Sequence, residues 1–245
     1  MKIVAWLSIL LLASGAVAGD SIIYLRPADA LNLNPWQADD FYSNEIAANI
    51  FEGLVRFKKN STAIEPCLAT SWKISADGRH WQFFLRRGVR FHDGMPFDSR
   101  AVLHSFQGRL ENKPSNLQRL SSIYSFITGV RSLGPHRVEI TLDRPYAPFL
   151  VALADSAAFI QSPGSAPSAS FVPIGTGAYR FVSWSKDRSL ILTHHAQYWG
   201  GKPGVEKVVF KVMPDPLGRL LQIRNGSADM TVIQSGKEFE ELSPV

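Results

Sequence analysis

Two acidic and three aromatic side chains lie together in the segment WQADDFY and could bind a ligand. Asp39 and Asp40 can attract an ammonium group, and Phe41 or Tyr42 can pack against a ligand side chain. An alternative stays open, because Asp40 or Ser43 could instead cap a helix by accepting hydrogen bonds from the free amides of its first turn. The segment is therefore a candidate site with a structural alternative.

Other patterns argue against catalysis, metal binding and phosphate binding. The six histidines lack the spacing of a zinc site, and the chain has no G-x-S-x-G elbow of a serine hydrolase. The glycines of Gly175-Thr176-Gly177 precede a strand-like segment and no Gly-Lys-Ser/Thr, so they favour a close crossing of chain segments between lobes over a phosphate loop. We expect no catalytic residue, no metal and no cofactor. Trp184, at the end of a strand, could cover a ligand or simply cap the core.

The candidate residues must be positioned by a mixture of helices and strands. Apolar residues at helical spacing predict a helix from about Ser43 to Leu54. Alternation around Gly-containing turns predicts two hairpins, and Asp98 is the expected N-cap of a further helix. The remaining elements are expected at residues 21–25 (strand), 147–153 (helix), a strand pair across 185–188, 205–212 (strand), 214–223 (helix) and 229–233 (strand), with an exposed linker at 162–170.

The order of motifs in the run from Ile46 to Phe106 is unusual. It reads IAANIFEGLVRF, IEPCLATSW and SADGRHWQFFLRRGVRFHDGMPFDSRAVLHSF. A second block reads GTGAYRF, YWGGKP, VVFKVMPDP and NGSADM. Together, from about Ile22 to Ile233, these motifs closely resemble the family 5 solute-binding proteins of ABC importers, which bind peptides, nickel chelates and related solutes.

The resemblance implies a mixed α/β fold. It predicts a first lobe of the type II periplasmic binding protein kind, formed by residues 19–52 and 172–245, with an inserted β-rich subdomain at 53–171. Family members are about twice as long, so the resemblance implies that the opposing second lobe is absent. A truncated gene product, a fragment whose other half is encoded separately, and a form with another role all stay open.

The resemblance also extends the candidate site. The loop after the Leu-Asn-Pro motif, here Trp36–Tyr42, often contributes to the family's binding cleft, and the turn at Asp155-Ser156-Ala157 can face it. Nickel-chelate binders of this kind place an Arg near that turn to meet carboxylates. This chain has Asp155 there instead, which favours a ligand with a free amine, such as a peptide.

The N-terminus predicts export by a cleaved signal peptide, residues 1–18. Lys2 is followed by an apolar stretch too short to span a bilayer and by Ala16-Val17-Ala18, a small-residue cleavage signal. Because no Cys follows the signal, we expect a soluble periplasmic protein and not a lipoprotein. Cys67 is the single cysteine, so no internal disulfide can form. A formal charge of +5 is spread along the chain, so we expect no nucleic-acid partner.

These observations predict a periplasmic solute-binding component of an ABC importer, with peptides as the expected solutes. Its partners would be a small peptide or similar solute and a permease in the inner membrane, and it would be a monomer if complete. Three alternatives stay open: a non-transporting interaction or sensory domain on the same scaffold, a binder of nickel chelates or other solutes, and a secreted hydrolase, which the missing nucleophile and metal motifs disfavour.

Overall fold

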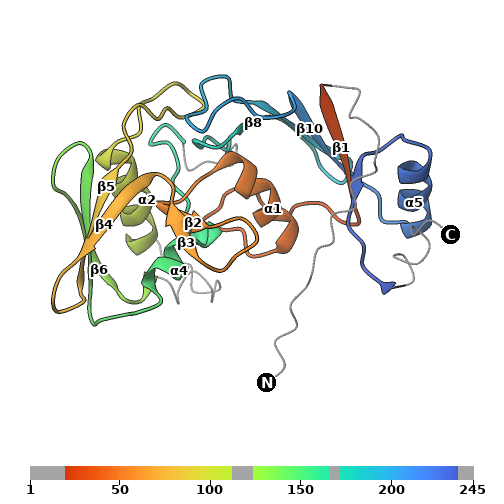
Figure 1. Cartoon of the computed structure of the whole chain (residues 1–245). Coiled ribbons are helices and arrows are strands. Elements are labelled where there is room, and N and C mark those ends of the chain that lie inside the picture. Colours follow the sequence, from red (N-terminus) through yellow and green to blue (C-terminus); the bar gives the residue numbers. More distant parts are fainter. Residues whose placement is uncertain (1–19, 112–123, 166–170, 237–245) are drawn as a thin grey trace. The chain divides into compact units, whose positions relative to one another are not determined.

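The computed structural model describes residues 20–111, 124–165 and 171–236, and these residues pack into two compact units (Figure 1). Unit 1 comprises residues up to Asp29 together with 182–194 and those from Pro203 onward, and unit 2 comprises Ala30–Phe181 and His195–Lys202. The expected signal peptide and residues 166–170 of the expected linker lie outside the described residues. In the described part of that linker Ser162 and Ser165 are buried, so the prediction of an exposed segment is wrong for these residues. The units divide the chain at other points than the predicted lobe and insertion, whose boundaries stay a prediction.

Unit 1 is built around a five-stranded mixed sheet in the order β11-β1-β10-β9-β8. Strand β1 runs parallel to β10, with Tyr24 opposite Phe210, and parallel to β11, while β10 and β9 are antiparallel. Helix α5 starts after Asp215, whose Oδ2 accepts a hydrogen bond from the Gly218 amide at 2.7 Å. The elements are β1 (Ser21–Arg26), β8 (Tyr179–Ser185, which begins in unit 2), β9 (Ser189–His194), β10 (Lys207–Val212), α5 (Pro216–Arg224) and β11 (Met230–Thr231).

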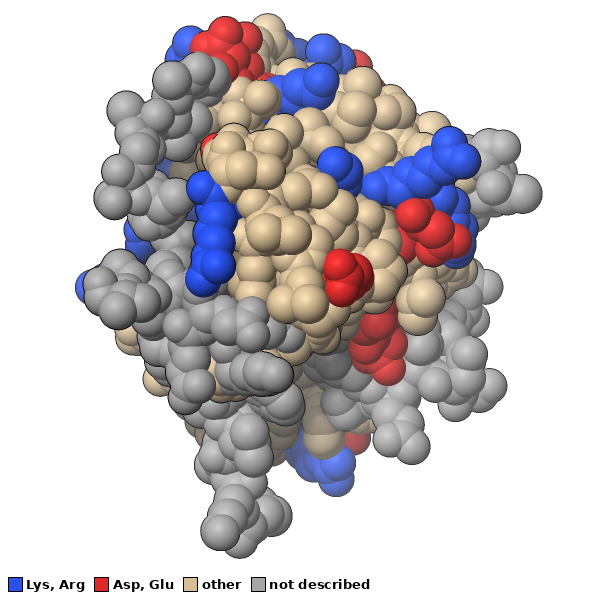
Figure 2. Space-filling model, turned by 90° about the vertical axis from the view of Figure 1, so that its right-hand side faces the viewer, with Lys and Arg blue, Asp and Glu red and all other residues tan. Residues whose placement is uncertain are grey.

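Figure 2 shows the face on the side where α5 lies in Figure 1. Basic side chains form separate groups on this face, with uncharged surface between them. Leu217 and Leu221, one turn apart on α5, are both exposed. The charge of the chain is therefore dispersed on this side.

Unit 2 contains a four-stranded antiparallel sheet in the order β4-β5-β7-β6, with helix α2 packed on one face (Figure 1). Buried and half-buried residues alternate along β5, as the sequence predicts for a strand with one face on the core. The elements are α1 (Phe41–Ile50), β2 (Val55–Phe57), β3 (Ile64–Pro66), β4 (Ala69–Ile74), β5 (His80–Leu85), α2 (Ser99–Glu111), β6 (Ile127–Ser132), β7 (Arg137–Leu142), α4 (Phe149–Leu153) and the 3₁₀ turn η1 (Ser156–Ala158). Both predicted hairpins and the mixed α/β class are confirmed.

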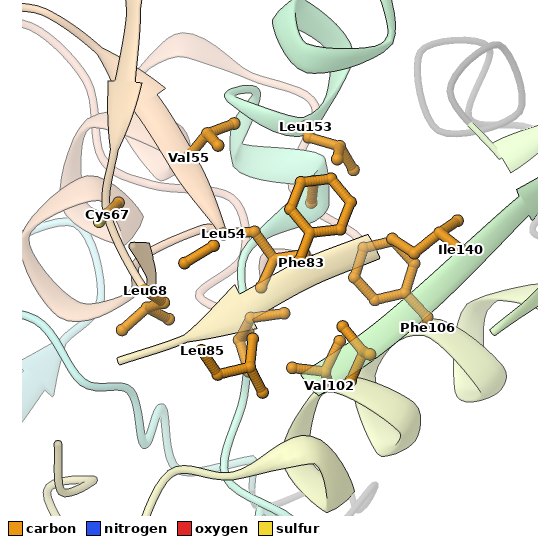
Figure 3. Close-up of a cluster of buried hydrophobic side chains, with 14 of the residues drawn as sticks. Leu54, Val55, Cys67, Leu68, Phe83, Leu85, Val102, Phe106, Ile140 and Leu153 are labelled. Carbon is orange, nitrogen blue, oxygen red and sulfur yellow. The ribbon is translucent and has the colours of Figure 1, made fainter. Parts of the chain in front are cut away.

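The main hydrophobic core of unit 2 lies between this sheet, α2 and the segments near α4 (Figure 3). Phe83 of β5 is fully buried and meets Phe106 and Val102 of α2 in this cluster. Trp81 stacks beside Phe83 and Trp72 packs against the core, so the prediction that these tryptophans are structural is confirmed.

The segment Gly175-Thr176-Gly177 packs directly against the end of α1. A Cβ atom on Gly175 would lie 2.0 Å from the carbonyl oxygen of Ile50, and one on Gly177 would lie 2.5 Å from that of Asn49. The Gly177 amide donates to the Ile50 carbonyl at 2.9 Å. The predicted close crossing is confirmed, although both segments belong to the same unit.

Candidate binding surface

The first predicted segment ends in the N-terminus of α1. Asp40 is the N-cap, and its Oδ1 accepts a hydrogen bond from the Ser43 amide at 2.9 Å. Ser43 does not act as the cap, since its buried hydroxyl instead accepts hydrogen bonds from the amides of Leu31 and Asn32. The capping alternative is thus correct for Asp40, and it fixes where the neighbouring side chains lie.

The aromatic pair of this segment is placed at the surface. The Phe41 and Tyr42 rings meet edge to face with centroids 5.3 Å apart. Phe41 is 57% exposed, Tyr42 is half-buried and Asp39 is exposed. An apolar ring beside acidic side chains could bind a solute that carries both an apolar group and a positive charge.

The second predicted segment lies against the first. Asp155 caps η1, with Oδ1 accepting from the Ala157 amide at 2.8 Å. The Ser156 hydroxyl donates to Oδ1 of Asn44 in α1 at 2.7 Å. The structure therefore places η1 against α1, whose first residues, Phe41 and Tyr42, belong to the first segment. We call the surface formed by Asp39, Asp40, Phe41, Tyr42, Asp155 and Ser156 the candidate binding surface.

Trp184 belongs to unit 1 and has a contact of its own there. Its indole Nε1 donates to Oδ2 of the buried Asp29 at 2.9 Å, and the amide of Asp187 donates to the same oxygen at 2.7 Å. This bonding holds the turn between β8 and β9. A ligand role for Trp184 stays a prediction.

Arg109 and Tyr124, which the sequence analysis did not single out, are buried beneath the candidate binding surface and contact residues next to it. Arg109 of α2 is buried, donates to the Tyr124 hydroxyl and to the Phe159 carbonyl, both at 2.6 Å, and lies 4.9 Å from the centroid of the Trp36 ring. The Tyr124 hydroxyl donates to the Ala157 carbonyl at 3.1 Å, and burial raises the pKa of Tyr124 to about 12. Arg109 follows Val102 by seven residues and therefore lies on the same, apolar face of α2. This position in the helical pattern is the sequence feature that could have indicated its burial.

Glu52 was also missed, and it organises a buried polar cluster. Its Oε2 accepts from the Thr176 hydroxyl and the Trp199 indole, both at 2.8 Å, and its Oε1 accepts from the Tyr198 hydroxyl at 2.9 Å. Burial raises the pKa of Glu52 despite these bonds, and burial also raises the pKa of the neighbouring Cys67 thiol. The cluster joins the FEGL, GTG and YWGG motifs and explains why they occur together.

Two histidines pack together beside the glycine crossing. His92 and His195 meet edge to face with centroids 4.9 Å apart. His92 Nε2 donates to the Gly177 carbonyl at 3.0 Å, and its Nδ1 accepts from the Gly175 amide at 3.4 Å. This arrangement needs a neutral ring, and burial, together with the nearby His195 and Arg180, lowers the pKa of His92 to about 4, although Asp93 and the Gly177 bond oppose the shift.

We expect the stability of the protein to fall as the pH drops from about 6.5 to about 4. In that window the unfolded chain binds a proton at His92 that the folded chain excludes, so unfolding is favoured at lower pH, by at most about 3 kcal/mol. Urea unfolding at pH 7.5 and pH 5 measures the effect. In His92→Gln the loss between the two pH values should be smaller, and an equal loss in both proteins would contradict the assignment.

Among the residues that the structure describes, no group of three or more His, Cys, Asp or Glu side chains is arranged to hold a metal ion. Within the same ranges, no helix is long and apolar enough to cross a membrane.

Comparison with known proteins places these features in a family. Residues 63–243 match the model of bacterial extracellular solute-binding proteins, family 5 (middle). The chain is 31% identical to the nickel-binding periplasmic protein of Escherichia coli K12, over 88% of this chain and 41% of the relative. It is 30% identical to a probable D,D-dipeptide-binding periplasmic protein of the same organism, over 89% of this chain and 44% of the relative.

A solved structure shows the same fold. The ABC transporter-associated periplasmic binding protein of Helicobacter pylori, in complex with the peptide STSA, matches with a TM-score of 0.83 and 31% identity. The match covers 91% of this chain and 48% of that one. The chain thus spans less than half the length of these relatives, and the predicted mixed α/β fold of the family is confirmed over that part.

Proposed function

Because this chain belongs to the family 5 bacterial extracellular solute-binding proteins, we propose that it is the periplasmic solute-binding component of an ABC importer and that its solute is a peptide. It would capture the solute reversibly outside the inner membrane and deliver it to a permease there. The binding is non-catalytic and needs no cofactor. The relatives differ in the solute that their names give, so the solute class must be argued from the residues of this chain.

The candidate binding surface carries the argument for a peptide. Its two segments contain Asp39, Asp40 and Asp155 but no Lys or Arg. The Ser156–Asn44 hydrogen bond holds η1 against α1, whose first residue is the exposed Phe41. Carboxylates attract the terminal ammonium of a peptide, and the ring offers an apolar contact for a peptide side chain.

The same charges disfavour a nickel chelate, the second solute class that the relatives suggest. Ligands that chelate nickel through carboxylates carry negative charge, and acidic segments without a basic side chain would repel them. A basic residue in either segment would have favoured the chelate.

Isothermal titration calorimetry of the purified chain tests the solute class, with trialanine, N-acetyl-trialanine and the negatively charged nickel–EDTA complex as probes. We expect trialanine to bind and its acetylated form to bind at least about tenfold more weakly, since acetylation removes the charge that the carboxylates recognise. Because this chain spans less than half the length of its relatives and a binding cleft normally buries most of its ligand, the titrations should extend to millimolar concentration.

Asn substitutions separate the charge from the fold. Asp155→Asn keeps an oxygen that can cap η1, and Asp39→Asn changes an exposed side chain, so each should weaken trialanine binding by about two- to fivefold without unfolding the chain. Asp143→Asn, an exposed acid outside the surface, is the control. Binding of the nickel complex but not of trialanine would overturn the peptide assignment. No binding of any probe would favour a non-transporting domain.

A further inference from the structure

Arg109 is a buried cation without an acidic partner among the residues that the structure describes. Arg109 is only 4% exposed, and this burial lowers the pKa of its guanidinium. Removing a guanidinium from water is costly unless hydrogen bonds and aromatic faces replace the lost hydration. Two hydrogen bonds of 2.6 Å and the rings of Trp36 and Tyr124 surround the Arg109 guanidinium. An apolar side chain would avoid this cost, so the charge calls for an explanation.

The contacts of Arg109 reach both segments of the candidate binding surface. On one side the guanidinium lies over the Trp36 ring. The backbone amide of Trp36 donates a hydrogen bond to Oδ1 of Asn34 at 3.0 Å. On the other side it donates to the Phe159 carbonyl directly and, through the Tyr124 hydroxyl, contacts the Ala157 carbonyl. These carbonyls belong to η1 and the residue that follows it. One guanidinium thus connects the segment before α1 to the segment that carries Asp155 and Ser156.

The neighbouring Gly108 sets how closely Trp36 approaches α2. A Cβ atom on Gly108 would lie 3.1 and 3.2 Å from Cζ3 and Cη2 of the Trp36 indole. Contacts this short require the indole to shift by a few tenths of an ångström. The absence of a side chain at 108 therefore lets the Trp36 ring rest on α2, next to the Arg109 guanidinium.

We propose that Arg109, together with Gly108, is a positioning element that sets the spacing between the two segments of the candidate binding surface. Arg109 does not touch the solute in this proposal. Its forked donors fix η1 while its planar face fixes Trp36, a combination that Lys, with a single compact ammonium, cannot reproduce. The proposal rests on the proposed function, because it assigns Arg109 a role in solute binding.

Two variants test the positioning role by different means. Arg109→Lys keeps the charge and removes the fork, so we expect the Kd for trialanine to rise at least about tenfold. Gly108→Ala improves the intrinsic helix propensity of α2 while crowding Trp36, so the thermal midpoint should not fall, yet the Kd should rise about threefold or more. Arg100→Lys makes the same exchange at an exposed position of α2 and should leave the Kd unchanged.

Amide hydrogen exchange distinguishes a positioning role from a general contribution to stability. In Arg109→Lys the amides of residues 36–44 and of 156–160 should both exchange at least about tenfold faster, while the amides of β10 in unit 1 keep their rates. Uniformly faster exchange, or an unchanged Kd in both variants, would overturn the proposal. If the unmodified chain binds no trialanine, the proposed peptide function is wrong. In that case the exchange data alone decide the role of Arg109: faster amide exchange in both segments of Arg109→Lys would show that Arg109 couples them.

Discussion

Gly175→Ala should destabilise the protein by at least about 3 kcal/mol, the largest effect that we expect from a single methyl group. The added Cβ would lie 2.0 Å from the Ile50 carbonyl oxygen and 2.8 Å from the Phe51 ring. Because the nearest atom belongs to the backbone at the end of α1, a side-chain rotation cannot relieve the clash. The crossing would have to open, and the Gly177–Ile50 hydrogen bond would be lost with it.

Urea unfolding and the yield of soluble protein measure this effect. Gly129→Ala is the matched control, because a Cβ on Gly129 in β6 would meet no atom within 4 Å. We expect the control to be neutral or slightly stabilising, since Ala loses less backbone entropy than Gly on folding. Equal stability of the two variants would show that the crossing is looser than the structure indicates.

Glu52→Ala should destabilise the protein by about 3 kcal/mol, because it leaves buried donors without an acceptor. The Tyr198 and Thr176 hydroxyls can rotate toward other partners, but the Trp199 indole N–H cannot. Glu52→Gln should cost much less. With its amide oxygen at the Oε2 position it still accepts from Thr176 and Trp199, and the Tyr198 hydroxyl can turn to accept from the amide nitrogen.

Glu65→Ala provides the control for this prediction. Glu65 pairs with Arg56 at 2.7 Å on the surface of β2 and β3, where both side chains are about a third or more exposed. Such a pair contributes at most about 1 kcal/mol. Chemical denaturation of the three variants should therefore rank Glu52→Ala well below Glu52→Gln and Glu65→Ala. If Glu52→Ala and Glu65→Ala were equally stable, the buried cluster would not be the link between the motifs.

Stability and binding should respond to different residues of unit 2. Glu52 and Gly175 act on the packing of α1 against the glycine crossing, whereas Arg109 and Asp155 act on the segments that flank α1 and η1. Variants of the first pair should change the unfolding free energy more than solute affinity. Variants of Arg109 and Asp155 should change solute affinity more than the unfolding free energy.

The sequence predicted the regular elements well where the information is local. The alternation in β5 and β7, the turn glycines and the apolar spacing of α1 all depend on residues a few positions apart. Boundaries shifted by one to four residues, the largest shift being at the end of α1, which stops at Ile50 instead of Leu54 because Phe51 is extended. Two of the shifts at helix starts also have a physical reason. Helix α1 starts at Phe41 because Asp40, not Ser43, is its cap, and α4 starts at Phe149 after Pro148.

The candidate surface was predicted in part. The segment Trp36–Tyr42 stood out by composition, and the turn at Asp155 was suggested by the family resemblance. That η1 meets α1 through Ser156 and Asn44 was not predictable, because those residues are 112 positions apart. The buried Arg109 was missed because an arginine in a helical pattern is usually assigned to the solvent face.

The sequence by itself determined the family, the mixed α/β class and the order of the elements, because motif order and local periodicity are properties of neighbouring residues. Only the tertiary structure decided which distant groups meet: β1 beside β10, Glu52 among Thr176, Tyr198 and Trp199, and Arg109 between the two segments of the surface. Such meetings depend on how complete elements pack, and the burial of a charge or carboxylate is a property of that packing rather than of the residue type.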